Sequence, residues 1–227
     1  MKITKSTLAR QVYKELHSRI TMGKLPIGQR LLPSTLADEL SISQTPVKEA
    51  LALLERDGLV TGEERRGAVV RAFTPKDIEA IYDARSMIER HALEAAFQKG
   101  LVTEAFKQSL EDKFKVMSQL SSERNMTNLL EFLRIDRELH SSIVAAADNP
   151  ILDDWHRLVL WQTQTVMTYS VENYFFERAM KEHRELIDAI CAGDLPAALE
   201  AISFHMEQCR VELVSRPPED GEVRGIN

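Results

Sequence analysis

Apolar residues recur at helical spacing throughout the last two-thirds of the chain, and this pattern constrains the fold more than any other. From Thr74 onward, Ile, Leu, Val and Met recur three and four residues apart, as in helices that bury one face. The breaks are short and fall at residues that end helices, namely Gly100, 148–150 and 193–196. Six helices fit between them, over about 75–97, 103–121, 127–147, 151–170, 174–192 and 195–214. Short connections favour an antiparallel bundle.

The first third of the chain has a different organisation. Apolar residues every four positions predict a helix over about 7–22. A short second helix ends near Ser41, and a third begins at 43–46, where Ser43 or Thr45 can cap it and Pro46 is tolerated in the first turn. Short β-type runs on both sides of a charged turn at 63–67 predict a hairpin.

Two short helices followed by a basic hairpin are the outline of a winged helix-turn-helix. The predicted fold class is therefore mostly α, with an N-terminal winged helix-turn-helix followed by an antiparallel all-helical bundle. We expect the first unit to span 1–72 and the bundle to span 73–215. Residues 216–227 are mostly polar, and we expect them to form a mobile tail.

Charge is distributed unevenly between these two units. Residues 1–72 carry 12 Lys and Arg against 8 Asp and Glu, whereas 73–227 carry 17 against 27. A basic first unit on an acidic body favours a polyanionic partner for the first unit alone.

The start of the third helix holds the candidate DNA-reading residues, because a helix-turn-helix presents that end of its second helix to the base edges. These residues are Ser43, Gln44, Thr45 and Lys48. A glutamine can form two hydrogen bonds with adenine, and a lysine can reach a guanine or a phosphate. The hairpin tip would meet the DNA backbone or the minor groove through Arg65 and Arg66, with Gly67 beside them. The pattern alone fits a small helical unit with a solvated hairpin equally well.

Several classes of protein are disfavoured by what the sequence lacks. It has no glycine-rich phosphate loop of the dinucleotide-binding or P-loop type. The longest stretch without charged residues, 158–171, is too short and too polar to span a membrane. Two cysteines without close spacing, Cys191 and Cys209, favour a reducing compartment, so we expect a cytoplasmic protein without a membrane partner.

Four residues of the predicted bundle have the type and number suited to a divalent metal such as zinc or nickel. Asp136 and His140 are four residues apart, so they share one face of a helix. His183 lies in the next helix but one, and His205 lies in the last. Ligands from facing helices can converge in the core of a bundle. On spacing alone, the alternative is four unrelated polar positions.

A string of nine residues, SQTPVKEAL at 43–51, carries a specific family signal, together with 58–60 and 65–70. This segment closely resembles the GntR family of bacterial transcription regulators. The family string has arginine where this chain has Gln44 and Lys48. The resemblance implies a DNA-binding winged helix-turn-helix whose sequence preference is altered at these positions, because a forked arginine grips phosphate or guanine with two hydrogen bonds.

The bundle is similar to the FCD domain of the FadR branch of that family, from about Phe73 to Leu213. The matching positions are Phe73-Thr74, Asp77-Ile78, Arg85, Ile88-Glu89, Asp136, His140, 148–152, Glu182-His183, Ala189-Ile190, Gly193-Asp194, Ala198 and His205. Many FCD domains hold a metal with this Asp and these three His. The resemblance therefore implies a divalent metal ion at Asp136, His140, His183 and His205.

The mechanism implied by the resemblance is sensing. Four protein ligands on an octahedral metal leave two positions that a small carboxylate or hydroxy acid can fill. Arg85 would pair with the other oxygens of this effector, or else form an ion pair with Glu89 one turn on. Gln162 and Gln164 are candidate polar groups of the same pocket. Effector binding would change affinity for a double-stranded DNA operator with palindromic half-sites, which a homodimer reads.

Two alternatives to this interpretation differ in class. One is a metal-dependent enzyme built on a helical bundle, which would need a general base beside an open metal site. We find no separate acid/base pair or Ser/His/Asp set for that role, and it leaves the basic hairpin unexplained. The other alternative is the same regulator with a metal-free pocket, in which His183 and His205 contact the effector directly.

Overall fold

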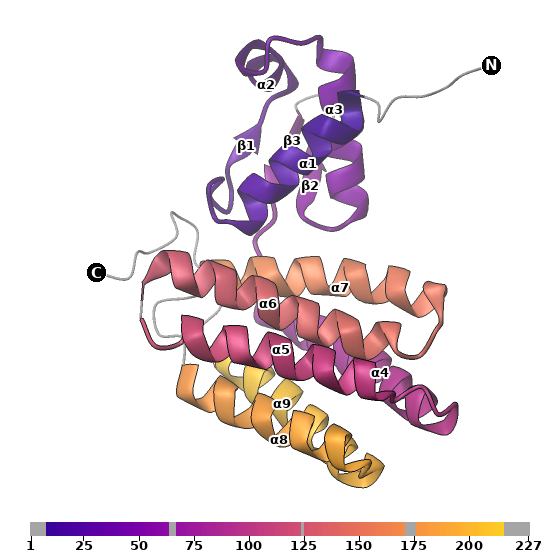
Figure 1. Ribbon diagram of the computed structural model, residues 1–227. Helices are drawn as coiled ribbons and strands as arrows, with labels where there is room; N and C mark the ends of the chain where they lie inside the picture. Colours follow the sequence, from indigo (N-terminus) through magenta and orange to yellow (C-terminus); the bar gives the residue numbers. More distant parts are fainter. Residues whose placement is uncertain (1–7, 64–66, 124, 171–175, 216–227) are drawn as a thin grey trace, which may run out of the picture.

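The computed structural model describes residues 8–63, 67–123, 125–170 and 176–215, which form a small mixed unit above a larger helical one (Figure 1). The small unit, called the head below, consists of α1 (Leu8–Thr21), β1 (Arg30–Leu31), α2 (Pro33–Glu39), α3 (Gln44–Arg56), β2 (Val60–Glu63) and β3 (Gly67–Val70). The larger unit, the body, consists of α4 (Pro75–Gln98), α5 (Glu104–Leu120), α6 (Met126–Ala145), α7 (Pro150–Tyr169), α8 (Phe176–Ala192) and α9 (Leu195–Ser215). This architecture confirms the predicted fold class.

The head has its own hydrophobic core, in which α1 and α3 pack against each other and against the sheet. The strands are antiparallel in the order β1-β3-β2. The strand β1 was not predicted from the sequence, because a strand of two residues shows no period. Gly67 allows β3 to approach β1: its φ is +98°, and a Cβ atom there would lie 2.3 Å from the carbonyl oxygen of Leu31.

The turn between α2 and α3 sets the direction of the third helix. Ser41 has a positive φ of 54°, which reverses the chain after α2. Ser43 occupies the N-cap position of α3, as expected, but its side chain makes no capping hydrogen bond. The hydroxyl of Ser43 is therefore free of that role and lies on an exposed surface.

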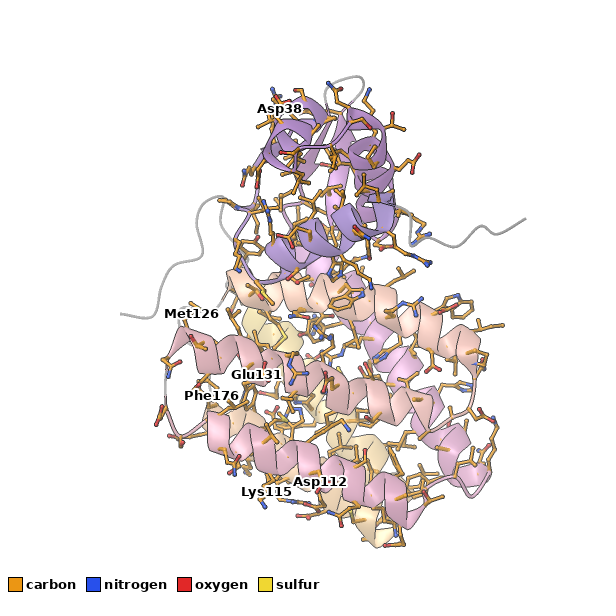
Figure 2. All side chains as sticks on the ribbon, turned by 45° about the horizontal axis from the view of Figure 1, so that its top comes forward. Asp38, Asp112, Lys115, Met126, Glu131 and Phe176 are labelled. Carbon is orange, nitrogen blue, oxygen red and sulfur yellow. The ribbon has the colours of Figure 1, made fainter. Side chains whose placement is uncertain are left out.

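The body is a ring of six helices in which α4 lies beside α9 and α7, and α5 lies beside α6 and α8. Its first helix begins as predicted at Thr74, where the hydroxyl accepts from the Asp77 backbone and the Asp77 carboxylate accepts from the Thr74 backbone. Asp112 and Lys115 of α5 are exposed and point away from the core (Figure 2). No helix in the described part of the chain is long and apolar enough to cross a membrane.

The head rests on α7 (Figure 1). The hydroxyl of Thr168 donates to the carbonyl of Thr21 at 3.0 Å, and that of Tyr169 donates to the carbonyls of Ile20, at 3.1 Å, and Leu25. The amide of Gln162 donates to the Asp57 carbonyl at 3.2 Å. The last carbonyls of a helix lack partners within it, so α7 supplies partners where α1 ends.

An aromatic contact completes this junction. The ring of Trp161 meets the buried ring of His17 edge-on, with centroids 4.0 Å apart. The guanidinium carbon of Arg137, on α6, lies 4.3 Å from the centre of the Trp161 ring. Burial and, to a smaller extent, the positive charge of Arg137 together lower the pKa of His17 to about 4, against the opposing charge of Asp57. Neutral His17 is thus part of the packed junction.

We predict that His17 makes stability depend on pH between about 6.5 and 4. The contribution of neutral His17 is complete above pH 6.5 and is lost as pH falls toward 4, because the unfolded chain takes up the proton first. The free energy of unfolding, measured with urea, should fall between pH 8 and pH 5 in both proteins. The fall should be about 2 kcal/mol smaller in H17N than in the wild type. An equal loss in both proteins would contradict this role.

Candidate functional site

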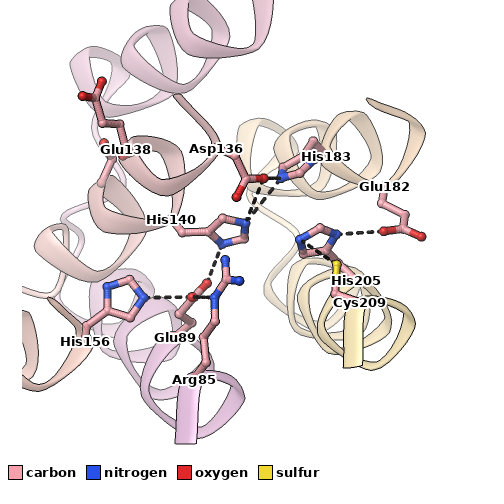
Figure 3. Close-up of polar contacts among 11 residues, drawn as sticks. Arg85, Glu89, Asp136, Glu138, His140, His156, Glu182, His183, His205 and Cys209 are labelled. Atoms are coloured by element: carbon pink, nitrogen blue, oxygen red, sulfur yellow. Dashed lines mark hydrogen bonds and ion pairs between the residues drawn. The ribbon is translucent and has the colours of Figure 1, made fainter. Parts of the chain in front are cut away.

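The four predicted metal ligands converge in the core of the body (Figure 3). Asp136 and His140 come from α6, His183 from α8 and His205 from α9. All four are buried, and one potential ligand atom from each lies within 4.8 Å of those from the other three. The spacing on α6 places its two members on one face, and helix packing brings the other two to them.

The separations within this cluster suit a coordinated ion. The Nε2 atom of His183 lies 2.9 Å from Oδ1 of Asp136 and 3.3 Å from Nε2 of His140. Oδ1 of Asp136 lies 3.9 Å from Nε2 of His140. Ligand atoms each about 2.1 Å from one metal ion, at right angles to one another, lie roughly 3 Å apart. The cluster therefore already has nearly the dimensions of a coordination shell.

Each histidine is oriented by a contact on the side away from the cluster centre. The Nδ1 atoms lie 2.6 Å from Oε2 of Glu89 for His140, 2.6 Å from the Ala179 carbonyl for His183 and 2.8 Å from Oε2 of Glu182 for His205. An Nδ1–H that donates to such an acceptor leaves the Nε2 lone pair free to bind a metal. The three contacts therefore select the tautomer that a metal site requires.

The electrostatics of the cluster also favour a metal-binding state. Burial lowers the pKa of His140 to about 4 and that of His205 well below its ordinary value. Burial alone would raise the pKa of Asp136, but the hydrogen bond with His183 and the neighbouring positive charges hold it below its ordinary value. The same hydrogen bond outweighs burial and raises the pKa of His183. A proton shared between His183 and Asp136 is what a metal ion would replace.

A buried carboxylate connects this cluster to the surrounding helices. Glu89 Oε1 lies 2.7 Å from Nε of Arg85 and 2.8 Å from Nε2 of His156, while Oε2 faces His140. His156, on α7, has no partner at ligand spacing in the sequence. Its partner lies 67 residues away on α4, a separation that leaves no trace in sequence periodicity.

Arg85 forms the ion pair with Glu89 that was one of its two expected roles, and part of its guanidinium stays unpaired within the described part of the chain. Its Nε pairs with Glu89, and its buried Nη2 has no hydrogen-bond partner among the described residues. Figure 3 shows the guanidinium directed toward the histidine cluster. The buried Oη of Tyr82 likewise has no partner of normal hydrogen-bond geometry in the described chain, and the ring of Tyr82 lies 5.8 Å from the Arg85 guanidinium carbon. Unpaired buried donors are costly, which makes these two groups candidates for hydrogen bonds to a ligand.

The two glutamines proposed for the pocket lie in different places. Gln164 is buried, and its Oε1 has no partner within the described segments. Gln162 points instead toward the head, where it contacts Asp57 and lies against Gly58. Helix geometry explains the difference, since residues two apart on a helix face different directions.

Cys209 borders the same cluster, with its sulfur 3.9 Å from Nε2 of His205. Together with Glu182, these residues form a second group of potential ligands that shares His205 with the first. Burial raises the pKa of the Cys209 thiol to about 12, so it lines the site as a neutral group.

The candidate DNA-reading residues lie together on the surface of the head. Four exposed side chains occupy the N-cap and first turns of α3, namely Ser43, Gln44, Thr45 and Lys48. Arg65 and Arg66 lie outside the described residues. Gly67 lies at the start of β3, where it contacts β1. The exposed start of α3 is thus available to enter a major groove.

Family models match both units of the chain. The model described as bacterial regulatory proteins of the gntR family matches residues 8–70, and the FCD domain model matches residues 80–208. The chain belongs to the GntR family, in its FCD branch. It is a transcriptional regulator and not an enzyme, since the family and the similar proteins are regulators. FCD domains commonly hold a metal, and this one has the buried cluster of His and Asp.

Similar proteins span almost the whole chain. The gluconate operon transcriptional repressor of Bacillus subtilis is 28% identical, over 92% of this chain and 87% of its own length. The probable D-xylose utilization operon transcriptional repressor of Paenarthrobacter nicotinovorans is 27% identical, over 90% of this chain and 88% of its own length. Among solved structures, a GntR regulator from Rhodococcus sp. RHA1 superposes with a TM-score of 0.79 at 21% identity, covering 92% of this chain and 99% of that one. E. coli McbR/YncC superposes with a TM-score of 0.76 at 20% identity, covering 93% of this chain and 99% of that one.

We predict that Glu89 supports metal affinity through His140. Removing a carboxylate that orients a ligating histidine costs about 10- to 100-fold in affinity. E89Q should show this loss in a chelator competition titration. E182Q should lose affinity in the same way through His205, and it tests the idea even if E89Q folds poorly. E138Q, at a partly exposed glutamate of α6 that pairs with Arg134, is the matched control. Unchanged affinity in both E89Q and E182Q would contradict the prediction.

Proposed function

We propose that this regulator binds a palindromic operator as a homodimer and that a small organic acid, bound at a divalent metal in the body, controls its operator affinity. The observation that carries the proposal is the buried cluster of Asp136, His140, His183 and His205. Each of its imidazoles is held by a hydrogen bond at Nδ1, on the side away from the cluster centre. Both relatives described above are named as repressors, which favours repression. We further propose that the chain divides near residue 72 and acts in the cytoplasm.

The donor set favours zinc or nickel. Imidazole nitrogens suit these borderline metals, and one carboxylate is compatible with both. When bound, the ion would supply positive charge and open coordination positions for an acidic effector. The protein's own part is to present three oriented Nε2 atoms and the Asp136 carboxylate in a buried core.

Arg85 supplies a second attachment point for an acid. Its Nε is held by Glu89, so the guanidinium is fixed while Nη2 remains available to an anion. A hydrogen bond between a guanidinium and a carboxylate is charge-assisted and strong when shielded from water. Tyr82 and Gln164 are further candidates for hydrogen bonds to the effector.

We predict that metal and effector stabilise the fold together. In a thermal-shift screen of small mono- and dicarboxylates and sugar acids, chelation should lower the melting temperature and abolish the rise caused by the active acid. Acids that stabilise the chelated protein equally well would instead support a metal-free pocket.

The Arg85 variant separates the two attachment points. R85K keeps the charge but loses the planar fork, so the affinity for the active acid should fall at least about tenfold, while the metal is retained. R90K, at an exposed arginine of the same helix, is the control. An unchanged acid affinity in R85K would remove Arg85 from the effector site.

We predict that Lys48 and Gln44 contribute differently to DNA binding. On an operator selected by the wild type from a random pool, K48A should weaken binding and reduce the salt slope by about one if it contacts a phosphate. Q44A should relax preference at one base position, at a cost of about 1–3 kcal/mol. K76A, at an exposed lysine at the start of α4, is the control. Wild-type binding by both K48A and Q44A would exclude α3 as the reading helix.

The proposed dimer is supported by the geometry of recognition. One head reads one half-site, so a palindromic operator requires two heads held at the half-site spacing. Sedimentation at micromolar concentration should give a dimer, and a monomer would contradict the proposal.

A further inference from the structure

Helix α7 contacts both the candidate metal centre and the head. Near its start, His156 reaches the carboxylate that orients a metal ligand. Toward its end, Trp161, Thr168 and Tyr169 contact α1 and the turn that follows it. These residues therefore place one rigid helix between the site that senses and the unit that reads DNA.

The first connection runs through Glu89. Its Oε2 accepts from His140, a predicted metal ligand, and its Oε1 pairs with His156 of α7 at 2.8 Å. Glu89 and His156 are almost completely buried. A strong hydrogen bond of 2.6 Å ties His140 to Glu89. Because the core is closely packed, a movement of His140 also moves Glu89, and with it His156 of α7.

The second connection runs through the residue that follows a predicted ligand. Arg137 comes directly after Asp136 on α6, and its guanidinium lies over the Trp161 ring. The other side of the contact belongs to the head, where His17 packs edge-on against the same ring. A shift of α6 along its axis changes the surface on which Trp161 rests.

The head should move together with α7, because several packed contacts and hydrogen bonds fix the two to each other. Trp161 packs against the hydrophobic core of the head. The Thr21 and Leu25 carbonyls, at and beyond the end of α1, accept hydrogen bonds from α7. Closely packed contacts of this kind switch between discrete arrangements instead of deforming gradually.

We infer that α7 transmits occupancy of the metal–effector site to the DNA-binding head, through His156 at one end and the Arg137–Trp161–His17 stack at the other. This inference rests on the proposed function, since it requires a ligand at the cluster.

Oδ1 of Asp136 and Nε2 of His140, both on α6, lie 3.9 Å apart, farther than the roughly 3 Å between neighbouring ligands of one ion. An ion bound to both would draw the His140 ring toward Asp136, and Glu89 with it. Arg137 follows Asp136 directly in the chain, so a displacement at Asp136 also reaches the Arg137–Trp161 contact.

The two tryptophans of the chain allow a direct test with zinc as the probe. Trp155 is exposed, so the variant W155F leaves Trp161 as the single tryptophan reporter. Zinc has a filled d shell and no redox chemistry, so a change in emission reports the surroundings of Trp161. Adding zinc to chelated W155F should shift the Trp161 emission and saturate at one ion per chain. It should also change operator affinity by about fivefold or more.

Variants at the two connections should uncouple the head while leaving the metal in place. In the W155F background, R137M keeps the aliphatic packing and removes the cation, and H156F keeps a ring and removes the hydrogen bond to Glu89. Both should bind zinc stoichiometrically and lose at least half of the zinc-induced emission shift and of the effect on operator affinity. R134M is the matched control, because Arg134 lies one turn earlier on α6 and pairs with Glu131 and Glu138.

The outcomes distinguish failure of the metal proposal from failure of transmission through α7. Loss of coupling in R137M and H156F but not in R134M supports transmission through α7. Stoichiometric zinc binding with no change in Trp161 emission, or equal zinc effects in R137M, H156F and wild-type backgrounds, overturns it and leaves the metal site standing. Absence of zinc binding by the folded protein overturns the metal proposal and the transmission together. Circular dichroism of each variant shows that its fold is intact.

Discussion

The buried carboxylate of Glu89 is the interaction on which the arrangement of the body depends. A charge removed from water is tolerated only when it is paired and hydrogen-bonded. Glu89 meets this demand with partners from three helices: Arg85 of its own α4, His140 of α6 and His156 of α7. Burial alone would raise its pKa, but these positive and hydrogen-bonding neighbours hold the pKa well below its ordinary value. The requirement to satisfy one carboxylate thus fixes where three helices meet.

The same interaction joins stability to sensing. The contact that holds Glu89 also fixes the tautomer of His140 and the direction of Arg85, so the bundle cannot relax without disturbing the candidate ligand site. The head is mounted on α7 by hydrogen bonds to the end of α1 and by the Trp161 contact. A regulator built in this way can report a small change in its core as a change in the position of its reading helix.

The sequence predicted the parts that depend on local pattern. The six body helices and the start at Thr74 follow from periodicity and capping, and the pairing of Asp136 with His140 follows from helical spacing. The parts it could not predict depend on packing between distant segments. His156 finds its partner on another helix, and Gln162 turns toward the head instead of the pocket. The family string supplied what periodicity could not, because nine residues in fixed order carry information about DNA docking that a helical pattern lacks.

The metal content of the untagged protein tests most simply whether the buried cluster is a metal centre. Elemental analysis after dialysis against zinc or nickel, followed by removal of free metal, should give about one divalent ion per chain. H183Q, which replaces one imidazole donor at the cluster, should hold far less. A folded wild-type protein without stoichiometric metal under both conditions would contradict the claim that Asp136, His140, His183 and His205 form a metal centre.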